Sequence, residues 1–373
     1  AYSAFGRDGV NIIPAHIWEP AMAQARTGEI SLKESQNPWY WSQEACIGTG
    51  AFRYVEGEPE QFIRLARFDD GWRGAPNIDE IIFQNFGNVD TQFLAFQKGE
   101  LDIFSVPPDY IDQIDGLADI TLDQFTTPYI QILEVNCANG DLALSDPRVR
   151  HAISSAINRE AINTGLYHGY NEPWTAVLQG EWYDPNTPQY PYDPEKAKAL
   201  LQEAGFDMSR ELVLGFDYPD NLPRQLMEVI QANLQEIGIK ATLLHVQDAA
   251  AEEARTNGRY TVWLNVYAAH YSPYVIATAH RMAQQASSGH CGSPELDALF
   301  DEAETIADPQ AQKVFWSELE GVVQADASVI PLWRRGVRVA YQNHLQGWDA
   351  NTTAAVAMFG FHAFGAEKWT VAG

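Results

Sequence analysis

The spacing of apolar and polar positions in the middle of the chain predicts two capped helices. One stripe of apolar residues has the period of a helical face: Val149, Ala152, Ile153, Ala156 and Ile157. Asp146 before Pro147, and Asp193 before Pro194, each place an N-cap side chain ahead of a proline that starts the helix. Gly205 suits the left-handed residue that ends the second helix.

Short apolar runs bounded by turn residues predict the strands. They lie at 51–56, 61–67, 81–86, 101–104, 120–125, 130–136, 212–216, 239–246, 260–266, 329–333 and 337–341. Further helices are predicted at 88–99, at 223–237, and after the cap-and-proline pairs Ser293-Pro294 and Asp308-Pro309. Strands that alternate with helices predict a mixed α/β fold with largely parallel strand pairing.

Composition narrows the class of protein. The 373 residues are 46% hydrophobic, which is enough for two or three domains with sizeable cores. The net charge of −26 argues against a nucleic-acid partner, because phosphate binding needs clustered lysine and arginine. It also disfavours binding to an anionic membrane surface, and we interpret it as a solvated acidic surface.

The sequence carries no signature of catalysis or of metal binding. It lacks the G-x-S-x-G, H-E-x-x-H, G-x-x-x-x-G-K-[ST] and G-x-G-x-x-G patterns. The three cysteines, Cys46, Cys137 and Cys291, form no C-x-x-C pair, and an odd number allows one disulfide at most without saying which. We therefore expect no enzyme activity, no cofactor and no metal.

The strand at 260–266 runs into a loop rich in tyrosine and histidine, where ligands of open α/β sheets bind. Five polar or aromatic residues there are candidates for ligand binding: Trp263, Asn265, Tyr267, His270 and Tyr271. The alternative is that this strand is buried and its aromatic residues are core. A buried asparagine or tyrosine needs a polar partner, which either a ligand or the protein supplies.

Three more residues are candidates for ligand contact. Trp333 and Arg335 share one face of the predicted strand at 329–341, whereas Arg334 points to the other. Arg255 is expected in a loop before Asn257-Gly258. For the arginines, the alternative to a ligand is an ion pair with the abundant acidic residues.

Four segments, in order along the chain, carry a resemblance to a known family. They are the strand opening Gly48-Thr49-Gly50-Ala51-Phe52-Arg53-Tyr54-Val55, the helix-to-strand turn from Leu94 to Ile103, the two capped helices within 145–205, and the strand Ser328-Val329-Ile330-Pro331-Leu332. Together they resemble the extracytoplasmic solute-binding proteins of ABC importers, of the oligopeptide, dipeptide and nickel type (family 5). The resemblance covers nearly the whole chain.

The resemblance implies a fold, an organisation and a function. The expected fold is a two-lobed periplasmic binding protein of type II topology, with mixed sheets flanked by helices. Residues 1–130 and 335–373 would form lobe I, and residues 131–334 lobe II. The expected function is capture of a peptide or oligosaccharide in the cleft between the lobes of a monomer, for delivery to a membrane permease. The expected location is periplasmic, or extracellular with a membrane anchor. Alternatives are a carbohydrate-active hydrolase and a ligand sensor.

Two departures from the family pattern qualify these expectations. Family members usually carry a segment ahead of the position of Ala1, so we expect lobe I to lack its first strands or to receive them from another polypeptide. In peptide-binding relatives an acidic residue that holds the peptide amino group stands where this chain has His270. That difference favours a neutral ring-bearing solute such as an oligosaccharide, bound by stacking on Trp263, Tyr267 and Tyr271 and by hydrogen bonds to Asn265 and His270. A peptide remains the main competitor.

Overall fold

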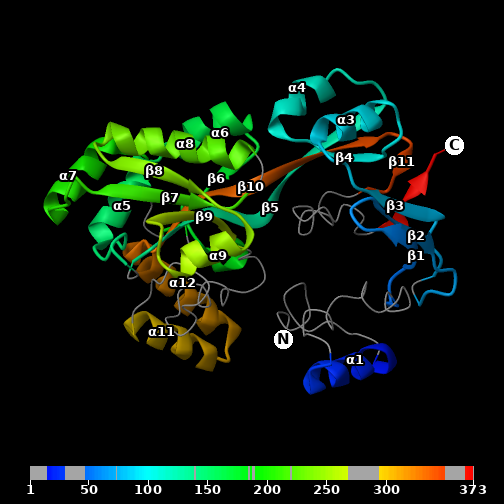
Figure 1. Cartoon of the computed structure of the whole chain (residues 1–373), viewed down its shortest axis with the longest axis horizontal. Coiled ribbons are helices and arrows are strands. Elements are labelled where there is room, and N and C mark those ends of the chain that lie inside the picture. Colours follow the sequence, from blue (N-terminus) through cyan, green and yellow to red (C-terminus); the bar gives the residue numbers. More distant parts are fainter. Residues whose placement is uncertain are drawn as a thin grey trace. The chain divides into compact units, whose positions relative to one another are not determined.

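The structure is a computed structural model that divides into two compact units (Figure 1). Unit 1 comprises Ala1–Phe125 and Arg338–Gly373, and unit 2 comprises Thr126–Val337. The residues that the structure describes are 15–29, 47–72, 74–137, 140–183, 185–186, 190–218, 221–267, 294–348 and 366–372. The sequence-based boundaries between lobes were 130/131 and 334/335.

Unit 1 is built around a three-stranded antiparallel sheet. Its strands are β1 (Phe52–Glu58), β2 (Phe62–Arg67) and β3 (Glu80–Gln84), with β2 in the centre. The helix α3 (Val89–Gln97) follows, and the side chain of Asn88 caps it by accepting from the backbone N–H of Thr91.

Shorter elements complete the described part of unit 1. They are α1 (Ala15–Thr27), β4 (Ile103–Ser105), η4 (Pro108–Tyr110), α4 (Ile111–Ile114), β11 (Leu345–Gln346), η8 (Ala366–Lys368) and β12 (Thr370–Val371). Leu345, Ala366 and Trp369 form a buried cluster against Phe52 and Ile81, which fastens the end of the chain to the three-stranded sheet.

The larger sheet has the order β4-β10-β5-β9-β7-β8. Its long strands are β5 (Ile120–Val135) and β10 (Val329–Gln342), and its shorter ones are β7 (Glu211–Phe216), β8 (Lys240–His245) and β9 (Val262–Tyr267), with β6 (Glu172–Pro173) beside β10. β7 pairs parallel with β8 and β9, whereas β5 pairs antiparallel with β9, and β10 with β4 and β6. The mixed α/β class is confirmed, but the prediction of largely parallel pairing is wrong.

Helices cover both faces of the part of this sheet that lies in unit 2 (Figure 1). One layer holds α5 (Pro147–Ala156), α6 (Arg159–Tyr167), α7 (Pro194–Ala204) and α8 (Asn221–Glu236); the other holds α9 (Asp248–Thr256), α11 (Pro294–Thr305) and α12 (Pro309–Asp326), and η5 (Gly180–Trp182) is a short turn. Leu133 and Val135 of β5 pack in the core of the first layer, and Ile130 and Ile132 in that of the second. This alternation along one strand gives each layer its own apolar core.

The predicted N-caps are present, but the segment after Asp146 forms two helices, α5 and α6, and not one. The side chain of Asp146 accepts from the backbone N–H of Arg148, and Asp193 starts α7 in the same way. The apolar stripe that ends at Ile157 does not continue in one helix, because Asn158 caps a new one. Its side chain accepts from the N–H of Ala161 at 3.0 Å.

Two further predictions of elements are wrong. β5 and β10 were each predicted as two strands, yet each is continuous. Arg255 lies in the last turn of α9 rather than in a loop. Among the described helices, none has the length and apolar content needed to cross a bilayer.

Candidate functional site

A buried glutamate organises the predicted site residues of β9. Glu134 of β5 lies opposite Trp263 in the antiparallel pair, and Ile132 lies opposite Asn265. Because paired and alternate residues of a sheet share a face, Glu134, Trp263, Asn265 and Tyr267 lie on the same side. Glu134 is 2% exposed, so its carboxylate needs partners from the protein.

Three of the predicted site residues bind this carboxylate. Arg255 of α9 forms an ion pair with it at 3.0 Å, from Nη2 to Oε2. Asn265 donates from Nδ2 to Oε1 at 3.0 Å, and the Tyr267 hydroxyl donates to the same oxygen at 3.2 Å. The arrangement joins β5, α9 and β9 through one side chain.

The protonation states follow from burial. Burial raises the pKa of Glu134, and the charge of Arg255 together with the hydrogen bonds from Asn265 and Tyr267 opposes that rise. Burial raises the pKa of Tyr267 well above its ordinary value, and the neighbouring Glu134 raises it further. The Tyr267 hydroxyl therefore keeps its proton and serves as a donor to Glu134.

This network turns the Tyr267 hydroxyl away from the carboxyl end of its strand. Tyr267 is the last residue of β9, whereas Glu134 pairs with Trp263 near the start of that strand. The hydroxyl thus points back along the sheet and is used inside the protein. The network holds the end of β9 in place through Asn265 and Tyr267.

Trp263 and Trp333 are both core residues in this structure. Trp263 is 0% exposed, meets Tyr260 edge to face with ring centroids 5.4 Å apart, and has the Arg255 guanidinium 5.7 Å from its ring. A Cβ at Gly215 of β7 would come within 2.2 Å of the Trp263 ring, so this glycine makes the room that the indole occupies. Neither indole presents a face to solvent, since Trp333 is 1% exposed.

The two arginines of β10 diverge as the strand geometry predicted. Arg334 forms an ion pair with Glu172 at 3.0 Å, and its guanidinium lies 5.2 Å from the Trp174 ring. Arg335 faces the opposite side, and its charge opposes the rise that burial causes in the pKa of Tyr167 and of Tyr218. His270 and Tyr271, the remaining candidates, lie outside the described residues.

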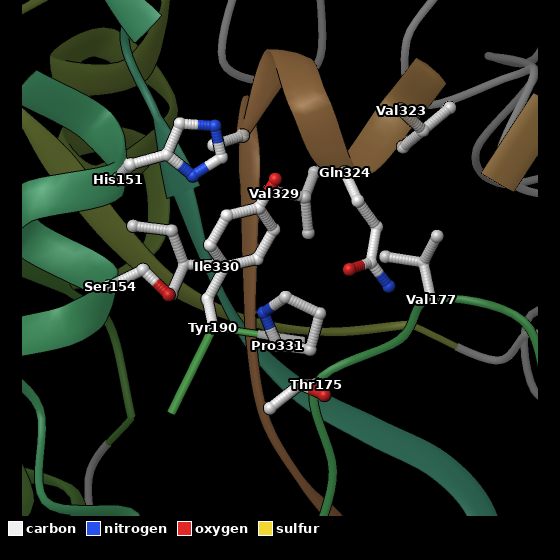
Figure 2. Close-up of a pocket in the computed structure, with 11 residues that line it drawn as sticks. His151, Ser154, Thr175, Val177, Tyr190, Val323, Gln324, Val329, Ile330 and Pro331 are labelled. Carbon is white, nitrogen blue, oxygen red and sulfur yellow. The ribbon is translucent and has the colours of Figure 1, made fainter. Parts of the chain in front are cut away.

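A small pocket in unit 2 lies apart from these residues (Figure 2). It has a volume of about 10 Å³, which is the room of roughly one water molecule. His151 of α5 and Gln324 of α12 line it, and the ring of Tyr190 stacks on His151 with centroids 4.2 Å apart. Its size excludes a solute, so we do not assign it as the ligand site.

Sequence reasoning missed Glu134. The signal was present, because a glutamate inside the apolar run Ile130-Gln131-Ile132-Leu133-Glu134-Val135 is a charge in a buried strand. Cys137, just beyond that strand, is disulfide-bonded, while Cys46 and Cys291 lie outside the described residues. In the described part of the chain, no three histidine, cysteine or acidic side chains gather as a metal site would require.

Comparison with curated proteins gives relatives along most of the chain. The glutathione-binding protein GsiB of Salmonella choleraesuis is 25% identical over 317 residues, which is 81% of this chain and 61% of that protein. The dipeptide-binding protein of Escherichia coli is 30% identical over 206 residues, covering 53% of this chain and 38% of that protein. The chain thus spans less than two thirds of the length of these relatives.

Solved structures share the fold. The ABC transporter substrate-binding protein CtaP from Listeria monocytogenes matches with a TM-score of 0.82 at 21% identity, over 96% of this chain and 71% of that one. The oligopeptide-binding protein AppA from Bacillus subtilis, in complex with a nonapeptide, matches with a TM-score of 0.77 at 19% identity, over 98% and 73%.

The family itself is shown by a profile that covers most of the sequence. The profile described as "Bacterial extracellular solute-binding proteins, family 5 Middle" matches residues 10–279. This is a family of binding proteins and not of enzymes, in agreement with the absence of catalytic motifs. The chain belongs to the family 5 extracellular solute-binding proteins.

Proposed function

We propose that this chain captures a peptide-type solute for an ABC import system and releases it unchanged to a membrane permease. The observation that carries the proposal is the family match over residues 10–279. Capture without conversion also fits a sequence that has neither a catalytic motif nor a metal-binding motif. The alternatives of a carbohydrate-active hydrolase or a sensor have no relative among the proteins described above.

A peptide or a glutathione-like molecule is the ligand class that we favour. The relatives described above are named for binding glutathione, dipeptides or oligopeptides, and one of their solved structures holds a nonapeptide. The expectation of an oligosaccharide ligand, which rested on His270 in place of an acidic residue, has no support among these relatives. Nickel-binding relatives also share the fold, but the described residues hold no cluster of metal ligands.

The site proposed for this ligand is the carboxyl edge of β7 and β9 in unit 2. Ligands of open α/β sheets bind outside the carboxyl ends of the strands. Glu134 fixes the end of β9 at this edge through Asn265 and Tyr267. Arg335 supplies a positive charge on the face of this sheet opposite to the one that carries Glu134.

An extracytoplasmic location is part of the proposal. Disulfides persist in oxidising compartments, and Cys137 is disulfide-bonded. The relatives include proteins named as periplasmic. A permease docked on the membrane is the partner that this location and family imply.

Calorimetry with a mixed panel tests the ligand class. The panel holds di- and tripeptide libraries, glutathione, and malto- and cello-oligosaccharides. We expect a peptide or glutathione to bind with one site per chain and a dissociation constant in the micromolar range or below, because a buried polar ligand gains several hydrogen bonds at about 0.5–1.5 kcal/mol each.

Blocked peptides serve as the control in this panel. An N-acetylated peptide keeps its size and loses the amino charge, so it separates binding of the peptide backbone from binding of the ammonium group. Saturable binding of an oligosaccharide with no response to any peptide or to glutathione would overturn the proposed ligand class and restore the sugar expectation.

A further inference from the structure

The small cavity of unit 2 is lined by side chains from three elements that are distant in the sequence. His151 and Ser154 come from α5, Gln324 comes from α12, and Ile330 and Pro331 come from β10. Its volume of about 10 Å³ gives room for roughly one water molecule. Any occupant of this cavity is therefore as small as water.

The side-chain amide of Gln324 has its orientation set by Glu320, one turn earlier on α12. Nε2 of Gln324 donates to Oε1 of Glu320 at 2.8 Å. The oxygens of Glu320 also accept from the backbone N–H groups of Val177 at 2.9 Å and of Leu178 at 2.8 Å. A carboxylate that accepts on both oxygens needs the NH₂ group of the amide turned toward it, so the amide oxygen of Gln324 turns away.

That oxygen is directed into the cavity and lacks a protein donor. Figure 2 shows Oε1 of Gln324 on the side of its amide that faces Tyr190. Oε1 is buried and accepts no hydrogen bond from any residue that the structure describes, and the whole side chain is in a residue only 5% exposed. Because buried amide oxygens are nearly always hydrogen-bonded, this atom calls for a donor inside the cavity.

The charges around the cavity favour a neutral occupant. The Ser154 hydroxyl in the lining accepts from Nη2 of Arg159 at 2.9 Å, which brings a positive charge close to one wall. A cation would be repelled by this guanidinium, and an anion would be repelled by the oxygen of Gln324. The side chains of Thr175 and Tyr190 also line the cavity, and their hydroxyls are further hydrogen-bond partners for a small polar molecule.

We propose that one water molecule occupies this cavity as a fixed part of unit 2 and donates a hydrogen bond to Oε1 of Gln324. The water completes a buried polar chain that runs through Gln324 and Glu320 to the backbone of Val177 and Leu178. The segment that follows β6 is thereby tied to α12. This site is separate from the proposed binding of a solute, so either can fail without the other.

A high-resolution crystal structure of the wild-type protein tests the site directly. We expect a density peak about 2.7–3.0 Å from Oε1 of Gln324, with a second polar group within the same range. A cavity without density, or one that its lining side chains have closed, would overturn the inference.

Oxygen-17 magnetic relaxation dispersion counts the long-lived water molecules in solution, and Gln324→Met is the informative variant. Methionine has a similar length and removes the acceptor, so we expect the count to fall by one. Gln310→Met is the matched control, because Gln310 is an exposed residue of the same helix and should leave the count unchanged. Equal counts for Gln324→Met and the wild type would contradict the role given to Gln324.

A cavity-filling variant keeps the test informative if Gln324→Met does not fold, which far-UV circular dichroism detects. Val177 lines the cavity and is 2% exposed, and Val177→Ile adds one methylene group, which is about the size of a water molecule. We expect this variant to lose one long-lived water and to melt about 2–4 °C lower, because Gln324 loses its donor. An unchanged water count together with a higher melting temperature would show a dry cavity and overturn the inference.

Discussion

Replacing Arg159 by methionine is expected to lower the free energy of unfolding by about 3–5 kcal/mol. Arg159 is 5% exposed and forms no ion pair with an acidic residue of the described part of the chain; it donates to the carbonyl oxygen of Pro331 at 2.8 Å and to that of Ser154 at 3.0 Å. Its Nη2 also donates to the Ser154 hydroxyl at 2.9 Å. Methionine fills much of the space but takes this donor from the Pro331 oxygen and the Ser154 hydroxyl, at about 1–3 kcal/mol for each buried group left unpaired, whereas the Ser154 carbonyl oxygen still accepts from the N–H of Ile157 at 3.3 Å.

The hydrogen bonds of Arg159 connect two helices to the sheet. Asn158 starts α6 and Arg159 ties the preceding end of α5 to β10 through Pro331. Burial lowers the pKa of Arg159 to about 10, so the guanidinium is still charged at neutral pH. The predicted loss is therefore one of hydrogen bonds to a cation, which are stronger than those between neutral groups.

Urea unfolding followed by far-UV circular dichroism measures this effect, with Arg148→Met as the matched control. Arg148 is an exposed arginine on α5 that bonds Asp146 and the carbonyl of Glu203. Water replaces those contacts, so the midpoint of the control should hardly move. Equal midpoints for Arg159→Met and the wild type would contradict the role given to Arg159.

Alanine at Gly336 is expected to prevent β10 from keeping its present course, with a loss of at least about 3 kcal/mol or failure to fold. A Cβ there would lie 1.6 Å from the carbonyl oxygen of Tyr170 and 2.5 Å from its carbonyl carbon. Both atoms belong to backbone, so no side chain can rotate to make room. The N–H of Gly336 also donates to Asn171 Oδ1 at 3.0 Å, which fixes the approach.

Gly165→Ala is the matched control, with the opposite expected sign. Gly165 lies inside α6, and a Cβ there would meet nothing within 4 Å. Alanine at this position should stabilise the protein by about 0.5–1 kcal/mol, because glycine loses more backbone entropy than alanine when it is fixed in a helix. Thermal melting of the two variants measures both changes, and a Gly336→Ala protein as stable as Gly165→Ala would show that the close approach to Tyr170 is absent.

N-cap residues followed by proline predicted where several helices begin, but the local sequence did not show that the long strands are continuous. Asp146, Asp193 and Asp308 cap helices as their cap-and-proline pairs indicated. β5 and β10 were each predicted as two strands, whereas Pro128 and Gly336 lie inside continuous strands. Their continuity is set by neighbouring strands in the sheet, which no local pattern contains.

The sequence indicated several residues that come together in the structure, but not the interactions that they make there. Asn265, Tyr267 and Arg255 do come together, but around Glu134, whose position across the sheet depends on the register between β5 and β9. Trp263 is enclosed because Gly215 on a neighbouring strand leaves space for it. Sequence spacing showed the face of Arg335, whereas its neighbours Tyr167 and Tyr218 come from elements distant in the chain.

The measurement that tests the central claim most directly is the fate of a bound solute. The peptide or glutathione that binds in the calorimetric panel is incubated with the protein at two ratios, equimolar and with a tenfold excess of solute. Mass spectrometry follows the solute and the protein over several hours. Capture for import predicts one solute per chain and recovery of the whole excess unchanged. Product that accumulates beyond one equivalent per chain would show turnover and contradict the account.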